Sequence, residues 1–377
     1  AERPFRDRLW RTSGVARRVL GQMGEGLPVL TYRIRPGLLV LMMAAAVAVA
    51  AGPAPGRNTL PSVNDLHAVT LYFENDMFAD TDRDYTNGVR LSWLSPDLES
   101  FEDWPLLEML RQAIPGFNRD GFTHNLGLAI GQDIYTPVDT RSSGLINDDR
   151  PYAGWLYGTL SLHRKNEDTL HKVDLTVGVV GPNSYAEQAQ NGIHRLRSLP
   201  TANGWDNQLG REVGFTLGYA YKRRIVLPLR SSGLLGADAV PGVSVKAGTV
   251  HARASAGVTV RMGWNVPRDF HGRRIEASGY TMPPPEGDWQ SLDRRLSCYV
   301  FGTAEGHAVA RNLFLDGNTF EDSHRVSRKP WVATGELGVG LRYHRLHITY
   351  AQIFHSKEFH GQDDSQAYGS VSAAWSF

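Results

Sequence analysis

The feature that most limits what this chain can fold into is a one-for-one alternation of apolar residues with small or polar residues. The alternation begins near Leu66 and recurs up to the last residue, Phe377. Successive side chains of a β-strand point to opposite faces, so a period of two predicts strands that each have one apolar face. About twelve strands are expected, near residues 67–75, 89–93, 126–131, 154–165, 173–179, 213–221, 240–249, 255–264, 297–310, 332–343, 345–356 and 366–377. The pattern indicates an all-β chain.

The residues between the apolar ones indicate which kind of β-protein this is. They are mostly Gly, Ala, Ser and Thr with scattered charges, and Gly accounts for 39 of the 377 residues. A soluble sheet usually shows water a strongly polar face, whereas a narrow barrel needs small side chains in its lumen. We therefore predict a transmembrane antiparallel up-and-down β-barrel whose apolar face meets lipid.

Aromatic residues near the strand ends agree with this prediction, because membrane barrels carry aromatic girdles at both interfaces. The candidates for the girdles are Trp155, Tyr157, Trp331 and Tyr343, and the last strand carries Tyr368, Trp375 and the terminal Phe377. A terminal aromatic strand resembles the recognition signal of bacterial outer-membrane barrels. The alternative is that these residues are ordinary core aromatics of a β-sandwich.

An even number of strands predicts which segments share each side of the membrane. Both termini fall in the periplasm, and the loops near residues 76–84, 136–153 and 181–211 fall on the outer surface. Segment 264–295 then falls on the periplasmic side, although periplasmic turns are normally short. Short helices are expected at Leu106–Ile114 and, in an outer loop, at Ser184–Leu196.

The first residues of the chain differ from the rest. Arg33 and Arg35 precede an apolar run, Leu38–Ala51, and Ala48-Val49-Ala50 gives a small-x-small cleavage pattern. The run is short for a membrane span and typical of a signal-peptide h-region. We assign residues 1–51 to an N-terminal extension and signal peptide, and residues 52–377 to one barrel domain, which predicts export. A retained anchoring helix is the alternative.

Composition excludes several classes of function. The chain has 40 Lys and Arg against 39 Asp and Glu, so it lacks the basic field of a nucleic-acid binder. Its one cysteine, Cys298, excludes an internal disulfide and a Cys-based zinc site. The sequence has no serine-hydrolase elbow, P-loop, dinucleotide fingerprint or zincin helix. Any chemistry must therefore come from other polar clusters.

The first such cluster spans the hairpin between the first two expected strands. Glu74–Asp76 ends one strand, and Asp82–Asn87 begins the next. Asp76 and Thr86 are expected to face each other across the mouth of this hairpin. Their oxygen atoms suit a hard cation such as calcium (Ca2+). The alternative is that they are solvated turn residues.

Two further clusters lie on the other loops of the same rim. Asn147–Gly154 contains Asp149, Arg150 and Tyr152, which either take part in a site or merely brace the loop. In Gly181–Leu196, Gln190 and His194 are spaced i, i+4 and so share one helix face. A His and a Gln placed this way can activate a water and hold a carbonyl, although a lone helical His is usually structural.

Five motifs, taken in order, resemble those of the outer-membrane lipid A deacylase family, the lipid A 3′-O-deacylases. They are END (Glu74–Asp76), DYTNG (Asp84–Gly88), GQDIYTP (Gly131–Pro137), DDRPYAG (Asp148–Gly154) and GPNS (Gly181–Ser184) with Gln190 and His194. The resemblance extends from about Leu66 to Phe377. It implies a twelve-stranded barrel that depends on calcium and removes the 3′-linked acyloxyacyl chain from lipid A at the outer-leaflet surface.

The resemblance also implies roles for individual residues. The family's catalytic His falls on His194, its Gln on Gln190, its Asn-Asp pair on Asn75 and Asp76, and its Thr on Thr86. The next residue, an acid in one branch of the family, is Met77 here. Arg150 receives no catalytic role.

We expect His194 to deprotonate a water that hydrolyses the ester without an acyl-enzyme, a step in which general-base help is worth about 10²- to 10⁴-fold. Asp76 would hold calcium with Thr86 or Asn75, and the ion would stabilise the oxyanion with Gln190 or Asn75. Arginines of the outer loops that are candidates to meet the lipid A phosphates are Arg83, Arg195 and Arg197. An outer-membrane phospholipase and a non-enzymatic porin-like barrel are the alternatives.

Overall fold

The computed structural model describes residues 66–76, 84–98, 121–228, 235–270 and 296–377, all within one compact unit, Arg57–Phe377. The predicted extension and signal peptide, and the expected helix Leu106–Ile114, lie outside the described residues. The strands are β1 (Ala68–Asn75), β2 (Asp84–Leu94), β3 (Thr123–Thr136), β4 (Ala153–Lys165), β5 (Thr169–Val180), β6 (Glu212–Arg223), β7 (Ile225–Leu227), β8 (Leu235–Gly248), β9 (His251–Trp264), β10 (Leu296–Asn312), β11 (Trp331–Tyr343), β12 (Leu346–His355) and β13 (Gln366–Ser376).

Twelve of these strands close into an antiparallel barrel, as predicted. Neighbours in the chain pair with one another, β1 pairs with β13, and β6 pairs with β8 to close the ring. The short strand β7, which the pattern did not predict, pairs only with β8 and stands outside the ring. The two ends of the described chain are joined by reciprocal backbone hydrogen bonds between His67 and Phe377, of 3.0 and 2.9 Å.

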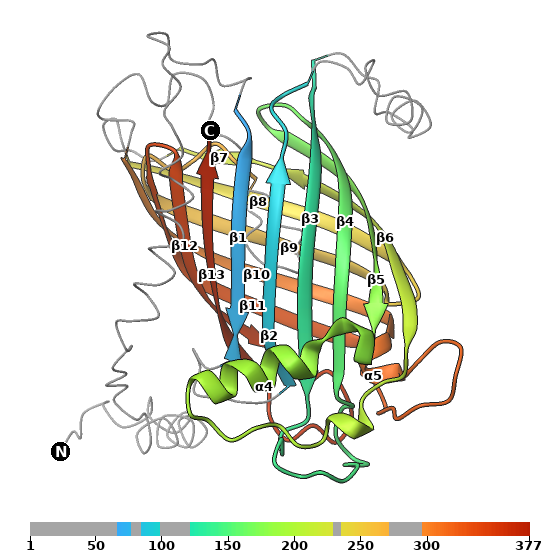
Figure 1. The fold of residues 1–377 in the computed structure, drawn as a ribbon. Coiled ribbons are helices and arrows are strands. Elements are labelled where there is room, and N and C mark those ends of the chain that lie inside the picture. The colour runs from blue at the N-terminus through green and yellow to red at the C-terminus, as the bar shows by residue number, and fades with distance from the viewer. Residues whose placement is uncertain (1–65, 77–83, 99–120, 229–234, 271–295) are drawn as a thin grey trace, which may run out of the picture. The chain divides into compact units, whose positions relative to one another are not determined.

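The helices lie at the opposite end of the barrel from these termini (Figure 1). We call the two ends the helix end and the terminal end. The helix end carries α4 (Ala186–Leu196), close to the predicted Ser184–Leu196, with α5 (Leu313–Asp316) and the 3-10 helices η3 (Pro182–Ser184) and η4 (Trp205–Asn207). The connection that follows Trp264 lies at the terminal end, the side on which segment 264–295 was expected. In the described part of the chain, none of the helices has the length and hydrophobicity to cross a bilayer.

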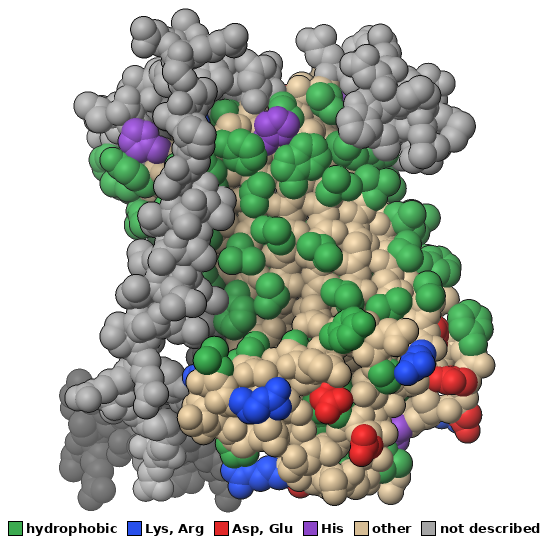
Figure 2. Space-filling model, in the orientation of Figure 1, with side chains coloured by type: hydrophobic (Ala, Val, Ile, Leu, Met, Phe, Trp, Pro, Cys, Tyr) green, Lys and Arg blue, Asp and Glu red, His purple; other side chains and the backbone are tan. Residues whose placement is uncertain are grey.

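The outer surface of the barrel is apolar, and Figure 2 shows hydrophobic side chains spread over the wall while the charged ones gather at the helix end. Leu71, Val89 and Ile130 are examples of outward residues that remain exposed. Trp331 and Tyr343 lie exposed at strand ends, as predicted for girdles. The same prediction was wrong for Trp155 and Tyr157, which are buried and pack in the lumen. The prediction put Trp155 and Tyr157 on the lipid-facing side of their strand. In the structure Leu156, which lies between them, faces the lipid, and both aromatic residues face the lumen.

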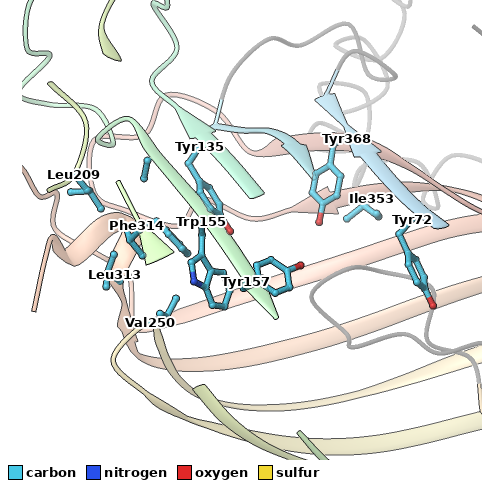
Figure 3. Close-up of a cluster of buried hydrophobic side chains, with 12 residues drawn as sticks. Tyr72, Tyr135, Trp155, Tyr157, Leu209, Val250, Leu313, Phe314, Ile353 and Tyr368 are labelled. Carbon is cyan, nitrogen blue, oxygen red and sulfur yellow. The ribbon is translucent and has the colours of Figure 1, made fainter. Parts of the chain in front are cut away.

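Side chains fill the lumen at the helix end. Phe314 of α5 stacks on Tyr135 with ring centroids 4.2 Å apart and lies 6.0 Å from Trp155 (Figure 3). These residues belong to one buried cluster with Leu313 and Val250. Because α5 brings a fully buried Leu-Phe-Leu sequence to the rim, it closes this end with apolar contacts.

A buried ionic cluster closes the lumen at the terminal end. The Arg261 guanidinium of β9 bonds Asp238 of β8 at 2.6 Å, and it also pairs with Asp269 from the connection after β9. Phe270, the next residue, packs in one cluster with Ala68, Leu94, Leu170 and Val240, which come from four different strands. Two cavities among the lumen side chains described between the ends hold only about 30 and 20 Å³.

Candidate active site

The wall of the barrel carries a polar patch on its outer face, at the helix end of β1 and β2. Asn75 and Asn87 are opposite each other in the register, and Asn87 is opposite Ile134 of β3. Both have the same phase as the exposed residues Leu71 and Val89, so they face outward. Unlike those residues they are buried, with 8% and 7% of their surface exposed. Something outside the wall must therefore cover them.

Helix α4 and the turn before it pack on the wall next to this patch, and Figure 1 shows α4 lying across the helix end of the barrel. Ala186 packs in one buried cluster with Ile134 and Tyr152. The side-chain amide of Gln132 on β3 donates a 2.6 Å hydrogen bond to the carbonyl of Ser184. Gly154 of β4 allows the closest approach, since a Cβ there would lie 2.2 Å from the Ala186 Cβ and the Ser184 Oγ. The absence of a side chain at Gly154 thus lets the helix lie against the wall.

The buried face of α4 carries the residues singled out in the sequence. Gln190 and His194 are 3% and 6% exposed and Asn191 is also buried, whereas Ile193 and Arg195 point to the other side and are exposed. The i, i+4 spacing therefore does place the His and the Gln on one face, as predicted. That face is turned toward the protein. The candidate site therefore lies where α4 packs against the outer wall of the barrel.

The hydrogen bond of His194 determines which of its ring nitrogens is basic. Nδ1 lies 2.6 Å from the carbonyl oxygen of Pro200. A carbonyl oxygen can only accept, so Nδ1 carries the proton and the lone pair of the neutral ring is on Nε2. A base held in this tautomer by its second nitrogen is the arrangement found in hydrolytic sites.

The amide of Gln190 is oriented in the same way. Trp205 donates its indole N–H to Oε1 of Gln190 over 2.9 Å. Nε2 of Gln190 is buried and has no hydrogen-bond partner among the residues that the structure describes. A buried donor without a partner costs about 1–3 kcal/mol, so its retention favours a ligand or transition state as the missing acceptor.

The backbone places the remaining predicted residues next to the patch. Asp76 directly follows Asn75 and is fully buried. Thr86 precedes Asn87 at a bulge, where the register of β2 against β3 skips one residue. The recorded register ends at Asn75 and Asn87, so Asp76 and Thr86 are each the next residue toward the hairpin loop, and their predicted pairing stays a prediction. The side chain of Thr86, together with Met77 and Arg83, lies outside the described residues.

The same residues decide whether this site could bind a metal ion. The described ranges contain no group of three or more His, Cys, Asp or Glu side chains that could hold a metal ion. The patch offers the amide oxygens of Asn75 and Asn87, and the next residue along the chain, Asp76, has a buried carboxylate. Carboxylate and amide oxygens are ligands that calcium accepts, so this donor set is compatible with Ca2+.

Asn87 is the residue of this site to which the sequence reasoning gave no role. It was part of the first polar cluster, but only its pairing with Asn75 and with Ile134 puts it in the covered patch. The signal was its place two residues before the exposed Val89, which sets it on the outer face. The alternative for the second cluster is confirmed for Arg150, which is buried and bonds Glu358 at 2.7 Å, bracing one loop against another.

Comparison with known proteins agrees with this picture. The model of a protein family described as "Outer membrane protein LpxR" matches residues 38–377. The chain belongs to the LpxR family. This is the outer-membrane lipid A deacylase family that the motifs indicated, and the protein is a multi-pass β-barrel of the outer membrane.

One solved structure, LpxR from Salmonella typhimurium, shows the same fold. It aligns with a TM-score of 0.63 and 19% identity, over 82% of this chain and 99% of that one. The translocator domain of the autotransporter NalP from Neisseria meningitidis covers 90% of this chain and 96% of its own, at 8% identity and a TM-score of 0.37. A search of curated proteins found no match.

Proposed function

We propose that this LpxR-family barrel hydrolyses the ester that links the 3′ acyloxyacyl chain to lipid A, in the outer leaflet of the outer membrane. One observation carries the proposal. The buried face of α4 carries a His194 whose Nε2 is the basic nitrogen and a Gln190 whose Nε2 is a buried donor without a partner among the described residues. A base and an oxyanion donor fixed on one rigid element are what ester hydrolysis by water requires.

The reaction follows from these groups. Nε2 of His194 takes a proton from a water, whose oxygen attacks the carbonyl carbon of the ester. The carbonyl oxygen becomes an oxyanion, which the N–H of Gln190 stabilises. When the tetrahedral intermediate collapses, the acyl–oxygen bond breaks and the proton on His194 passes to the leaving alkoxide. The products are a free acyloxyacyl acid and lipid A with a free 3′-hydroxyl group, and no acyl-enzyme forms.

We also propose that the patch on the wall binds calcium. Asp76 would supply the carboxylate, and Asn75 or Thr86 would supply further oxygen, with Asn87 beside them. When bound, the ion polarises the ester carbonyl as a Lewis acid. Asn75 also remains a candidate donor to the oxyanion.

The alternatives receive less support. A serine-dependent phospholipase needs a hydroxyl at Nε2, the basic nitrogen of its His, and among the described residues no hydroxyl bonds that atom of His194, whose one recorded side-chain hydrogen bond is made by Nδ1. A porin needs an open lumen, whereas the aromatic cluster at the helix end and the Arg261 cluster at the terminal end fill this one. Hydrolysis at the outer wall therefore accounts for more of the structure.

Lipid A masses test the proposal. We express three proteins in a host that carries lipopolysaccharide: the wild type, His194→Ala and the control His360→Ala. The control changes an exposed loop histidine. We expect the wild type and His360→Ala to remove the 3′ acyloxyacyl mass, and His194→Ala to leave lipid A intact. Intact lipid A beside folded, surface-exposed wild-type barrel would refute the function.

A further inference from the structure

Trp205 belongs to none of the groups assigned a part in the reaction. It begins η4, in the segment that returns from α4 toward β6. Its side chain is almost fully buried in a cluster with Ile134, Ala186 and Tyr152, and its ring lies 5.0 Å from that of Tyr152. Packing alone would be served equally well by an aromatic residue without a polar group. The indole N–H therefore calls for a separate explanation.

That N–H is directed at a catalytic side chain. An indole nitrogen is a donor only, so the 2.9 Å contact with Gln190 identifies the atom facing it as the carbonyl oxygen Oε1. The NH2 group of Gln190 must then lie on the other side of the amide. We propose that Trp205 is a positioning residue for the deacylation, because it holds the Gln190 amide so that its NH2 group, and not its oxygen, faces the reacting ester. This inference rests on the proposed function.

The surrounding segment makes the arrangement rigid. Residues 200–205 make four hydrogen bonds to the buried face of α4: Pro200 accepts one from His194, Ala202 exchanges two with Asn191, and Trp205 donates one to Gln190. Without the indole donor, the terminal amide torsion of Gln190 is free to turn by about half a rotation, because that torsion is broad and roughly two-fold. The amide oxygen would then face the forming oxyanion and repel it.

The kinetic test uses Trp205→Phe, which keeps an aromatic ring and removes the donor. We expect kcat to fall about tenfold, the effect of losing one hydrogen bond, with KM unchanged. In a Gln190→Ala background the same change should have no further effect, since the group it positions is gone. Trp331→Phe, at an exposed indole of the outer wall, is the control. Equal losses in both backgrounds would show a structural role and overturn the proposal.

A spectroscopic test remains valid even if Trp205→Phe does not fold. The indole ¹H–¹⁵N resonance of Trp205 is recorded for the detergent-solubilised wild type and Gln190→Ala. We expect a clear shift and faster proton exchange in Gln190→Ala, with the other indole resonances unmoved. An unchanged Trp205 resonance would show that the bond does not form and overturn the inference. Because this readout needs no turnover, it separates failure of the inference from failure of the deacylase function.

Discussion

Replacing Gly154 with Ala tests whether the rate of deacylation depends on how closely α4 approaches the wall. The new Cβ would lie 2.2 Å from the Ala186 Cβ and the Ser184 Oγ. Ordinary contact is about 3.5–4 Å, so the helix must move away by roughly 1.3 Å or more. Overpacking of this kind costs about 1–3 kcal/mol. Since a misplacement of about 1 Å can cost about 10²-fold in rate, we expect a loss of that order.

The matched control is Gly158→Ala, on the same strand and the same face. A Cβ at Gly158 would meet only the Ala129 carbonyl oxygen, at 3.8 Å, which is ordinary contact. Deacylation of lipid A in detergent micelles is measured for both variants, with heat-dependent gel mobility as the check that each barrel is folded. If Gly154→Ala kept the rate of Gly158→Ala, the reaction would not take place where α4 packs on the wall, and the covered patch would not be part of the site.

Three further predictions concern the patch and the lumen. Asn87→Ala should lower the rate of deacylation about tenfold or more. Its unfolding temperature should stay unchanged, because none of the described residues forms a hydrogen bond with this side chain. A normal rate, measured by lipid A mass spectrometry, would remove Asn87 from the site. Calcium should raise the unfolding temperature of the wild type, and less so that of Asp76→Asn, since a ligand that binds only the folded state stabilises it; equal shifts would place the ion elsewhere. The barrel should give no single-channel conductance in planar bilayers, because side chains close both ends of its lumen; steady conductance would revive the porin interpretation.

Much of the barrel could be predicted because period two is a physical requirement of a wall with lipid on one side. A strand such as Val213 to Tyr221 cannot shift by one residue without exposing its polar face to lipid, so its sequence shows which side each residue takes. The rule fails where both faces are apolar. Residues 155–157 are all apolar, so the sequence does not show which of them faces the lipid, and Trp155 and Tyr157 were assigned to that side. Their contacts with the luminal cluster around Phe314 show that they face the lumen.

The site could be predicted in its parts and not in its assembly. The i, i+4 spacing of Gln190 and His194 defines a shared helix face from the chain alone. That this face packs against the outer wall depends on the contact of Gly154 with Ala186 and Ser184, which come from segments that meet only in the folded chain. Trp205 was missed for the same reason, since nothing near it in the sequence marks an indole as the partner of Gln190.

The most direct test of the central claim, that water activated by His194 attacks the acyl carbonyl, is the fate of its oxygen. Purified barrel is incubated with lipid A in ¹⁸O-water, and the masses of both products are measured. Attack of water on the acyl carbonyl predicts one ¹⁸O atom in the released acyloxyacyl acid and none in the lipid A product. We expect no release by His194→Ala. Label in the lipid A product, or undiminished release by His194→Ala, would contradict it.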